Sequence, residues 1–287
     1  MSIDGHTRIY GLIGFPVSHT RSPAMLNAAF DTLGMNAVYI PFEVHPGRLA
    51  DALKGLAALG AKGFNVTVPH KRAVMDYCDS VSEEAAVIGA VNTVLVDGDK
   101  LRGENTDGRG FVRALELDMG FEFEGKTVFI MGAGGAGRAV GVMSAIRGAQ
   151  GVRVADIDRG RAVDLADTIN SKLRPGICRV VEPGVGELRT ALEDVHLFVD
   201  ATPLGLKPGD DASIDVAWIN PGALVYDLVY NPPVTGLVSA ARAAGMRAEN
   251  GLGMLLHQGA IAFELWTGEE APIEVMKGAL GKALRPA

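Results

Sequence analysis

Apolar and polar positions follow two periods that alternate along the chain, and this alternation predicts strands separated by helices. Apolar stretches at Arg8–Gly14, 37–44 and 63–68 predict strands. Residues 23–34 predict a helix because they begin with proline and end with glycine, and residues 46–60 predict another because their leucines have helical spacing. Such alternation is typical of parallel sheets covered by helices on both faces.

A hairpin interrupts this alternation before it starts again. Residues 92–96 and 101–104 flank a turn that contains Gly98, and they predict two antiparallel strands. A helix is predicted next, at 109–119. From Lys126 onward the strand and helix patterns alternate again, which indicates a second α/β region.

A glycine-rich turn follows an apolar stretch near the middle of the chain, in the segment Val128-Phe-Ile-Met-Gly132-Ala-Gly134-Gly-Ala-Gly137-Arg138. Glycine permits a tight bend at Gly132, a close approach of the backbone to a pyrophosphate at Gly134, and close packing of helix on strand at Gly137. The helix that follows directs free N–H groups and its positive dipole end at phosphates. The next apolar stretch ends in Asp156, where the acid that binds an adenosine ribose is expected.

The expected fold class is α/β, with two α/β domains. About two domains are expected for 287 residues, and the second is expected to be a Rossmann-type, doubly wound dinucleotide-binding domain. Two predicted helices at 254–267 and 272–284 have no strand after them, so we expect them to return to the first, substrate-binding domain. The expected boundaries are 1–106 with 251–287 for the substrate domain and 107–250 for the dinucleotide domain.

Composition and charge restrict the classes of partner. The chain has 27 basic and 34 acidic residues and a net charge of −7, which argues against a nucleic acid or a membrane surface as partner. The sequence contains no run of 18 apolar residues and no signal-peptide pattern, so we expect a cytoplasmic protein. We also expect it to be a monomer or a homodimer. Cys78, Cys178 and the histidines lack the spacing of metal ligands, and no metal site is expected.

Candidate chemistry lies before the glycine turn. Thr67 and Lys71 follow a predicted strand, so we expect them at the carboxyl edge of the sheet, where open α/β sheets bind ligands. Lys71 can hydrogen-bond a substrate hydroxyl or protonate a carbonyl oxygen. Each candidate also has a simpler interpretation: Lys71 as a solvated lysine at a helix start, and Asp107 and Ser22 as N-terminal caps.

Seven short segments stand in a fixed order along nearly the whole chain. They are Gly14-Phe-Pro-Val-Ser-His19-Thr20-Arg-Ser22-Pro23, Asn65-Val-Thr-Val-Pro-His-Lys71, Gly89-Ala-Val-Asn92-Thr, Asn105-Thr-Asp107-Gly, Gly132-Ala-Gly-Gly-Ala-Gly-Arg, Tyr226-Asp-Leu-Val-Tyr230 and Gly251-Leu-Gly-Met-Leu-Leu-His-Gln258. Together they resemble the shikimate dehydrogenase family, including its quinate/shikimate branch. An ordered set of this kind is far more specific than any one of its members.

The resemblance implies a role for each matching residue. Thr20 and Ser22 match two hydroxyls that bind the substrate carboxylate, with Thr20 in place of serine, and Tyr230 matches a tyrosine that reaches the same group. The residues that match contacts to the ring hydroxyls are Thr67, Asn92, Asp107 and Gln258, and the pair that matches the catalytic pair is Lys71 with Asp107. The implied cofactor-binding residues are Gly132, Ala133, Gly134, Gly135, Ala136, Gly137, Asp156, Asp158, Arg161, Thr202, Gly251 and Met254.

The resemblance implies reversible hydride transfer between NAD(P) and shikimate or 3-dehydroshikimate, a step of aromatic amino acid biosynthesis, with quinate as a second substrate. Two other functions remain open. Another small two-domain dehydrogenase, for an amino acid or a folate, would not need Thr20, Ser22 and Tyr230 to converge on one carboxylate. A non-catalytic NAD-sensing module would not need both Lys71 and Asp107.

The segment after the second strand of the dinucleotide domain departs from the NADP-dependent members of the family. Those members carry an Asn-Arg-Thr-type segment whose arginine binds the 2′-phosphate, whereas this chain has Ile157 in place of that arginine. Asp156 can accept a hydrogen bond from a ribose 2′-hydroxyl but repels a 2′-phosphate. Arg159 and Arg161 compensate only if the loop folds inward. We therefore expect NAD as cofactor in preference to NADP.

Overall fold

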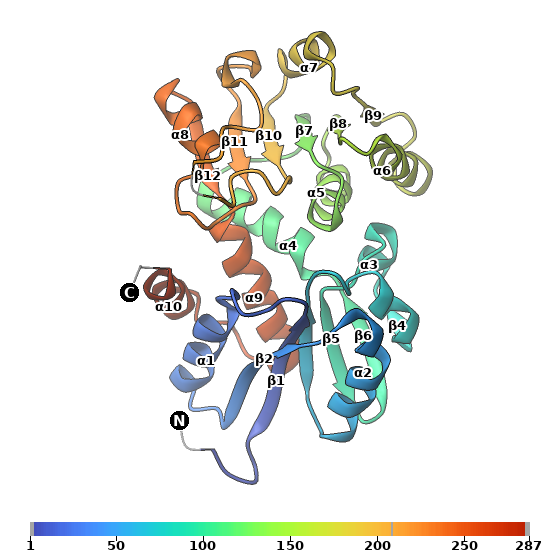
Figure 1. The fold of residues 1–287 in the computed structure, drawn as a ribbon, viewed down its shortest axis with the longest axis vertical. Coiled ribbons are helices and arrows are strands. Elements are labelled where there is room, and N and C mark those ends of the chain that lie inside the picture. Colours follow the sequence, from blue (N-terminus) through green and yellow to red (C-terminus); the bar gives the residue numbers. More distant parts are fainter. Residues whose placement is uncertain (1–2, 208, 285–287) are drawn as a thin grey trace. The chain divides into compact units, whose positions relative to one another are not determined.

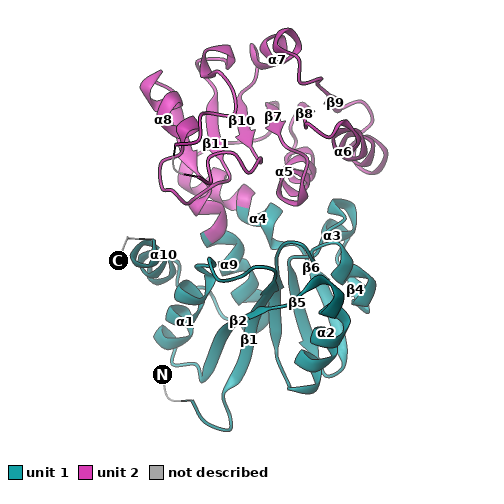
Figure 2. Ribbon diagram, in the orientation of Figure 1, with its two compact units in different colours: residues 1–110, 256–287 teal, residues 111–255 magenta. Residues whose placement is uncertain are grey.

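The computed structural model describes residues 3–207 and 209–284, and the chain divides into two compact units (Figures 1 and 2). Unit 1 comprises residues 1–110 and 256–287, and unit 2 comprises residues 111–255. The sequence places these boundaries at 106/107 and 250/251. Both observed boundaries instead fall inside helices, α4 (Thr106–Arg113) and α9 (Leu252–Thr267). Residues 1–2 and 285–287 of the expected substrate domain lie outside the described residues.

Unit 1 contains a mixed sheet with the strand order β2-β1-β3-β5-β6-β4. Its first three strands are parallel, whereas β5 pairs antiparallel with both β3 and β6. The β5–β6 pair is antiparallel because two strands joined by a tight turn must run in opposite directions. The predicted hairpin is confirmed, and parallel pairing holds for only part of this sheet. The strands are β1 (Arg8–Gly14), β2 (Ala37–Glu43), β3 (Gly63–Val66), β4 (Ser80–Val81), β5 (Thr93–Asp97) and β6 (Lys100–Glu104), and the helices confined to this unit are α1 (Ser22–Thr32), α2 (Leu49–Ala58), α3 (Glu83–Ile88) and α10 (Ile273–Ala283).

Unit 2 contains a wholly parallel sheet with the order β12-β11-β10-β7-β8-β9. Read from β9, this is the 3-2-1-4-5-6 order of the doubly wound dinucleotide fold, and the order reverses between β7 and β10. The expected Rossmann-type domain is confirmed. Its strands are β7 (Thr127–Met131), β8 (Gly151–Ala155), β9 (Cys178–Val180), β10 (Leu197–Asp200), β11 (Leu224–Asp227) and β12 (Arg247–Asn250), and its helices are α5 (Gly135–Ile146), α6 (Arg159–Lys172), α7 (Val185–Leu192) and α8 (Gly236–Ala243).

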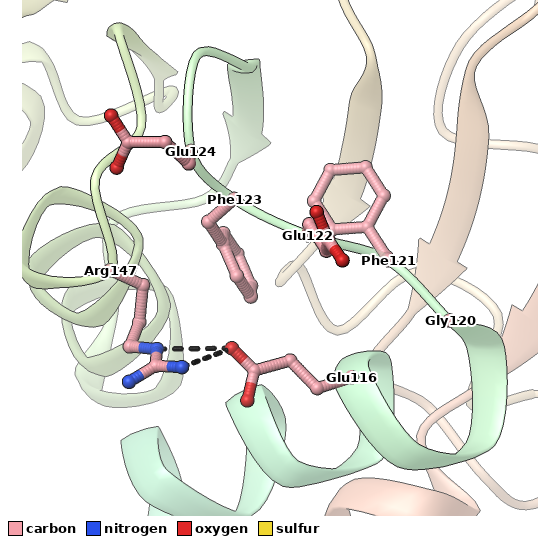
Figure 3. A pocket seen from close by; sticks show the side chains of 7 residues that line it. All are labelled: Glu116, Gly120, Phe121, Glu122, Phe123, Glu124 and Arg147. Carbon is pink, nitrogen blue, oxygen red and sulfur yellow. Dashed lines mark hydrogen bonds and ion pairs between the residues drawn. The ribbon is translucent and has the colours of Figure 1, made fainter.

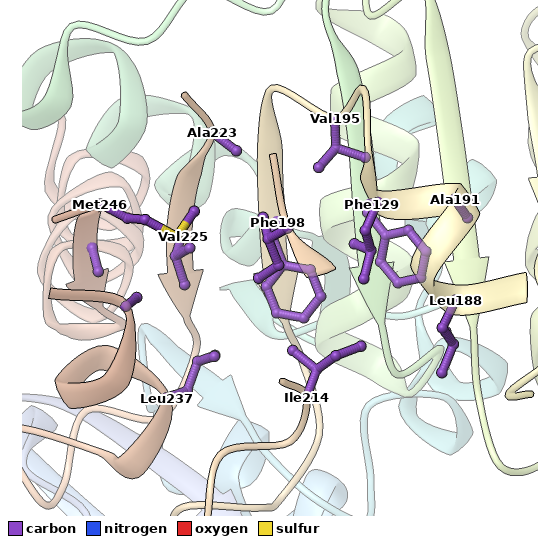
Figure 4. Packing of buried hydrophobic residues seen from close by; sticks show 14 of the residues in the cluster. Phe129, Leu188, Ala191, Val195, Phe198, Ile214, Ala223, Val225, Leu237 and Met246 are labelled. Carbon is purple, nitrogen blue, oxygen red and sulfur yellow. The ribbon is translucent and has the colours of Figure 1, made fainter. Parts of the chain in front are cut away.

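The core of unit 2 is built on the two strands at which this order reverses. Phe129 of β7 and Phe198 of β10 are both fully buried and stack with ring centroids 5.7 Å apart. Leu188, Val225 and other apolar side chains surround them (Figure 4). Strands covered on both faces need apolar residues at successive positions, which explains the unbroken apolar segment before the glycine turn.

The C-terminal helices belong to unit 1, as the sequence predicts. Trp266 of α9 donates its indole N–H to the carbonyl of Val94, 3.0 Å away, and its ring lies 5.4 Å from that of Tyr10 and 6.1 Å from that of Tyr39. A Cβ atom on Gly63 would lie 2.3 Å from the indole nitrogen. Glycine at this position therefore lets the tryptophan close over the sheet.

Two buried aspartates end neighbouring strands of unit 2. Asp200 of β10 and Asp227 of β11 are register partners, and both are only 1% exposed. Asp227 accepts hydrogen bonds from the amide of Val229, at 2.9 Å, and the hydroxyl of Thr235, at 2.5 Å. Burial raises the pKa of Asp227 to about 6, and the nearby carboxylate of Asp200 adds to the increase. The ionised Asp227 therefore costs stability at neutral pH.

We expect Asp227→Asn to stabilise the protein more at pH 7.5 than at pH 4.5. The aspartate has a higher pKa in the folded chain than in the unfolded chain, so its stability contribution is present below the unfolded pKa and is lost as pH rises through about 6. Asparagine does not ionise and removes this loss. Each kcal/mol recovered raises the melting temperature by roughly 2–4 °C at this size.

Thermal unfolding at the two pH values measures the effect. Asp99→Asn, an exposed change of the same charge in the hairpin turn, is the matched control. If the melting-temperature difference between Asp227→Asn and the unmodified chain is the same at both pH values, the aspartate does not carry the raised pKa.

Candidate active site

The topology of unit 1 brings its polar segments to one edge of the sheet. Ser22 follows β1, and Lys71 follows β3, so both lie beyond the carboxyl ends of parallel strands. Because β5 runs antiparallel to β3, Asn92 just before β5 lies at the same edge. The chain returns to this edge along β6, and Asp107 follows. Segments far apart in the sequence therefore converge where α/β sheets bind ligands.

An ion pair stands at this edge. The ammonium Nζ of Lys71 donates to Oδ2 of Asp107 at 2.6 Å, and the two side chains are only 20% and 10% exposed. The side-chain amide of Asn92 donates to the other carboxylate oxygen, Oδ1, at 2.8 Å. Both oxygens of Asp107 thus accept hydrogen bonds from named partners, and the ammonium is held at the sheet edge. Lys71 is therefore not a solvated lysine.

The simpler interpretations of Asp107 and Ser22 as helix caps are wrong. Helix α4 begins at Thr106 rather than at the predicted residue 109, and the side chain of Asn105 accepts from the amide of Gly108 at 3.2 Å. Asn105 thereby performs the capping that was open to Asp107. Ser22 is the first residue of α1, after an N-cap residue that makes no side-chain capping bond. Both side chains are therefore available for other contacts.

The remaining candidates of unit 1 surround this edge. The Thr20 hydroxyl accepts from the amide of Ser22 at 3.4 Å, so the two candidate carboxylate contacts are neighbours. Thr67 is half-buried directly after β3. A Cβ atom on Gly110 would lie 2.5 Å from the backbone nitrogen of Gln258. Close packing of α4 on α9 therefore brings Gln258 against the helix that carries Asp107.

Several buried polar residues behind the ion pair were not among the predicted site residues. They are Tyr39, Asn65, Thr93 and Thr106, none more than 5% exposed. Thr106 donates its amide to Oδ1 of Asn92 at 2.7 Å, and Asn65 donates to Thr93 at 3.0 Å. One sequence signal could have indicated them, because they are polar residues at positions where the strand pattern predicts apolar ones.

The glycine turn of unit 2 has the shape that a dinucleotide requires. Gly132 has a φ of +97°, and a Cβ atom on Gly137 would lie 1.9 Å from the carbonyl oxygen of Gly132. A Cβ atom on Gly134 would meet nothing within 4 Å, which leaves space for a phosphate beside the start of α5. Asp156 accepts from the amide of Ala133 at 2.7 Å. The turn and the candidate ribose carboxylate therefore form one structural unit.

The first turn of α6, which follows Asp156, carries two arginines that already have carboxylate partners. Asp158 caps α6 by accepting from the amide of Gly160 at 3.0 Å, and it lies 3.3 Å from the guanidinium of Arg161. Arg159 pairs with Glu182 at 2.7 Å. Ile157 is fully exposed. Neither guanidinium is held over the position of a ribose by these contacts.

Four further candidates lie in the loops of unit 2 and at the start of α9. The amide of Thr202 donates to Asp200 at 2.8 Å, and Tyr230 is half-buried beyond β11. A Cβ atom on Gly251 would lie 2.1 Å from a backbone oxygen of the β11 loop, so only glycine fits. The amide of Met254 donates to the phenol oxygen of Tyr226 at 3.1 Å.

An open pocket of about 410 Å³ also lies on unit 2 (Figure 3). The ion pair between Glu116 and Arg147, 2.6 Å apart, and the segment around Phe121 and Phe123 form its wall. Arg147 follows the last residue of α5, whereas the glycine turn precedes the first, and twelve helical residues span about 18 Å. The pocket is therefore separate from the candidate dinucleotide site.

Residues 3–207 and 209–284 contain neither a candidate metal centre nor a candidate membrane-spanning helix. No group of His, Cys, Asp and Glu side chains in this part of the chain is arranged to hold a metal ion. No helix there has the length and apolar character needed to cross a membrane.

Comparison with known proteins identifies the family. Residues 12–94 match the model of the shikimate dehydrogenase substrate binding domain, and residues 251–280 match that of the shikimate 5′-dehydrogenase C-terminal domain. A shikimate dehydrogenase (NADP(+)) from Methanopyrus kandleri is 47% identical over 288 residues, which cover 99% of each chain.

Solved structures give the same result over the whole fold. A shikimate dehydrogenase in complex with NADP+ is 39% identical, with a TM-score of 0.93 and coverage of 99% of this chain and 98% of the other. A shikimate 5-dehydrogenase from Listeria monocytogenes, in complex with shikimate and NAD, is 36% identical, with a TM-score of 0.92 and coverage of 98% of each chain. On this evidence the chain belongs to the shikimate dehydrogenase family.

Proposed function

We propose that this chain catalyses the reversible oxidation of shikimate to 3-dehydroshikimate with a nicotinamide dinucleotide. The observation that carries the proposal is the Lys71–Asp107 ion pair, held by Asn92 at the carboxyl edge of the unit 1 sheet. Similarity to relatives named shikimate dehydrogenase supports the choice of substrate.

The substrate carboxylate is assigned to the start of α1. Thr20 and Ser22 offer two neighbouring hydroxyls there, and the helix N-terminus adds a positive dipole end. We assign Tyr230 as a third contact to this carboxylate on the basis of the family resemblance. Thr67, Asn92 and Gln258 are assigned to the ring hydroxyls, because amide and hydroxyl groups both donate and accept hydrogen bonds.

Lys71 and Asp107 are assigned to the hydroxyl that reacts. During ketone reduction negative charge develops on the oxygen, and a positioned ammonium stabilises it. Asp107 lies 2.6 Å from Nζ and keeps this ammonium oriented toward the substrate. The proton that completes the hydroxyl group comes from the Lys71–Asp107 pair, and in the oxidation direction the pair takes it back.

The dinucleotide is assigned to unit 2. The turn from Gly132 to Gly137 fits its pyrophosphate, because a side chain on Gly137 would collide with the turn and the space beside Gly134 is open. Asp156 is assigned to the adenosine ribose, and the loops of Asp158, Arg161, Thr202, Gly251 and Met254 complete the set. When bound, the nicotinamide ring accepts or supplies the hydride.

We further propose that NAD is preferred over NADP. Asp156 presents a carboxylate beside Ala133, and a 2′-phosphate at this position would meet like charge. Ion pairs with Glu182 and Asp158 give Arg159 and Arg161, in the first turn of α6, competing partners. Relatives of this chain are named shikimate dehydrogenase (NADP(+)), so the ratio of kcat/KM for the two coenzymes decides between NAD and NADP.

A matrix of coenzymes and substrates tests both proposals. With shikimate, we expect turnover in the nicotinamide absorbance band and a higher kcat/KM for NAD than for NADP at equal ionic strength. Asp156→Asn is expected to raise kcat/KM for NADP by about tenfold relative to NAD, because it removes a charge a few ångströms from the 2′-phosphate. The same assay with quinate in place of shikimate shows whether quinate is a second substrate, and its kcat/KM is compared with that for shikimate.

Two outcomes of this matrix contradict the proposals separately. A tenfold or greater advantage for NADP in the unmodified chain rejects the NAD preference alone. Tight coenzyme binding without turnover of shikimate or quinate rejects the enzymatic function and favours the NAD-sensing alternative.

Lys71→Met is expected to lower kcat by about 10²–10⁴-fold and to change KM for shikimate far less. The substitution keeps much of the side-chain length but removes the donor that acts on the charged transition state. Lys54→Met, on the exposed face of α2, is the matched control. Steady-state kinetics separate the two constants, and an increase in KM with kcat unchanged would mean that Lys71 only binds substrate.

A further inference from the structure

A continuous set of hydrogen bonds inside unit 1 leads to the ion pair. The phenol of Tyr39 donates to Oδ1 of Asn65 at 2.7 Å, and Nδ2 of Asn65 donates to the hydroxyl of Thr93 at 3.0 Å. The Thr93 hydroxyl donates to Oδ1 of Asn92 at 3.1 Å. Asn92 in turn donates to the carboxylate of Asp107. We call these five residues the polar chain.

Backbone groups fix the direction of these bonds. Asn65 also faces the carbonyl oxygen of Asn92 at 3.3 Å, which can only accept, so Nδ2 must point that way. The amide of Thr106 can only donate, so the atom of Asn92 that faces it at 2.7 Å must be Oδ1. The opposite atom, Nδ2, is thereby aimed at Asp107. Each amide of the polar chain has one orientation.

The other end of the polar chain is the buried phenol of Tyr39. Burial raises the pKa of Tyr39, and the nearby Ser22 side chain opposes this only in part, so the phenol keeps its proton and can donate it to Asn65. Tyr39 and Asp107 are therefore connected through buried side chains alone.

Burying the polar groups of Tyr39 and Thr93 costs stability because these groups lose their hydrogen bonds to water. Tyr39 is 2% exposed and Thr93 is not exposed at all, and apart from the terminal residues Glu43 and Asp97 the other positions of their strands are apolar. Phenylalanine and valine would fill nearly the same space without polar atoms that require partners. A fully satisfied buried network fixes the orientation of its members, and here the member at its end is Asp107.

We propose that Tyr39 and Thr93 are positioning residues, which hold Asn92 and Asp107 in the reacting orientation. Neither touches the reacting atoms. The inference rests on the proposed dehydrogenase function, because the pair that they position is the pair assigned to the reacting hydroxyl and its proton. Small displacements of reacting groups lower reaction rates by large factors. We therefore expect loss of either positioning residue to lower kcat.

Tyr39→Phe, Thr93→Val and the double variant test the inference with shikimate and the preferred coenzyme. Each single change is expected to lower kcat by about tenfold, and Thr93→Val is expected to leave KM within about twofold. Because both residues act through one chain, the double variant should have a kcat close to that of the slower single variant rather than their product. Thr93→Ser restores the hydroxyl and should restore kcat.

Tyr10→Phe is the matched control. Tyr10 is the register partner of Tyr39 on β1, and its ring lies against the same tryptophan, but it is not a member of the polar chain. The inference is overturned if Tyr10→Phe lowers kcat as much as Tyr39→Phe, or if the two single effects multiply in the double variant. Should Thr93→Val fail to fold, the loss of kcat in Tyr39→Phe compared with that in Tyr10→Phe still tests whether Tyr39 is a positioning residue.

The unmodified chain separates this inference from the function on which it rests. Absence of turnover by the unmodified chain rejects the proposed function and the positioning roles with it. Normal turnover by the unmodified chain, together with kcat unchanged in Tyr39→Phe and Thr93→Val, rejects the positioning roles alone.

Discussion

The contact between the ammonium of Lys71 and the carboxylate of Asp107 is the interaction on which the rest of unit 1 depends. A partly buried ion pair is weak evidence for stability, because removing two charges from water costs about as much as their attraction returns. Its geometry is nevertheless fully specified: Nζ occupies one carboxylate oxygen at 2.6 Å and Asn92 the other at 2.8 Å. Such a pair adds little net stability, and its presence is expected where the orientation of charged groups matters for chemistry.

The candidate site of unit 2 depends on a different constraint, because its backbone segments must approach one another closely. Gly137 must be glycine because any side chain would meet the carbonyl of Gly132, and Asp156 then reaches the amide of Ala133. The first unit therefore prepares a charged pair and the second an open, positively polarised turn. Each suits one half of a reaction that moves a hydride and a proton separately, and the proposed dehydrogenase function requires both.

The sequence pattern predicted correctly those elements whose structure depends on residues close together in the chain. The bounds of β1, the hairpin around Gly98 and the glycine turn agree with the sequence, because each depends on neighbouring residues. The amphipathic helix α6 and the short edge strand β12 were not predicted, since polar residues dominate both. The start of α4 was placed three residues late because Asn105, and not Asp107, caps it. The polar chain could not be predicted, since it joins β2, β3 and β5, and its pairing depends on strand register.

A structure of the chain with shikimate bound is the most direct test, because the proposed chemistry requires the reacting hydroxyl oxygen to lie beside Nζ of Lys71. We expect the oxygen of one ring hydroxyl within about 3.2 Å of Nζ of Lys71 and also within hydrogen-bonding distance of the Asp107 carboxylate, with the ion pair intact and the substrate carboxylate at Thr20 and Ser22. Shikimate bound with its ring hydroxyls away from Lys71, or with the ion pair separated and both groups turned to solvent, would contradict the account.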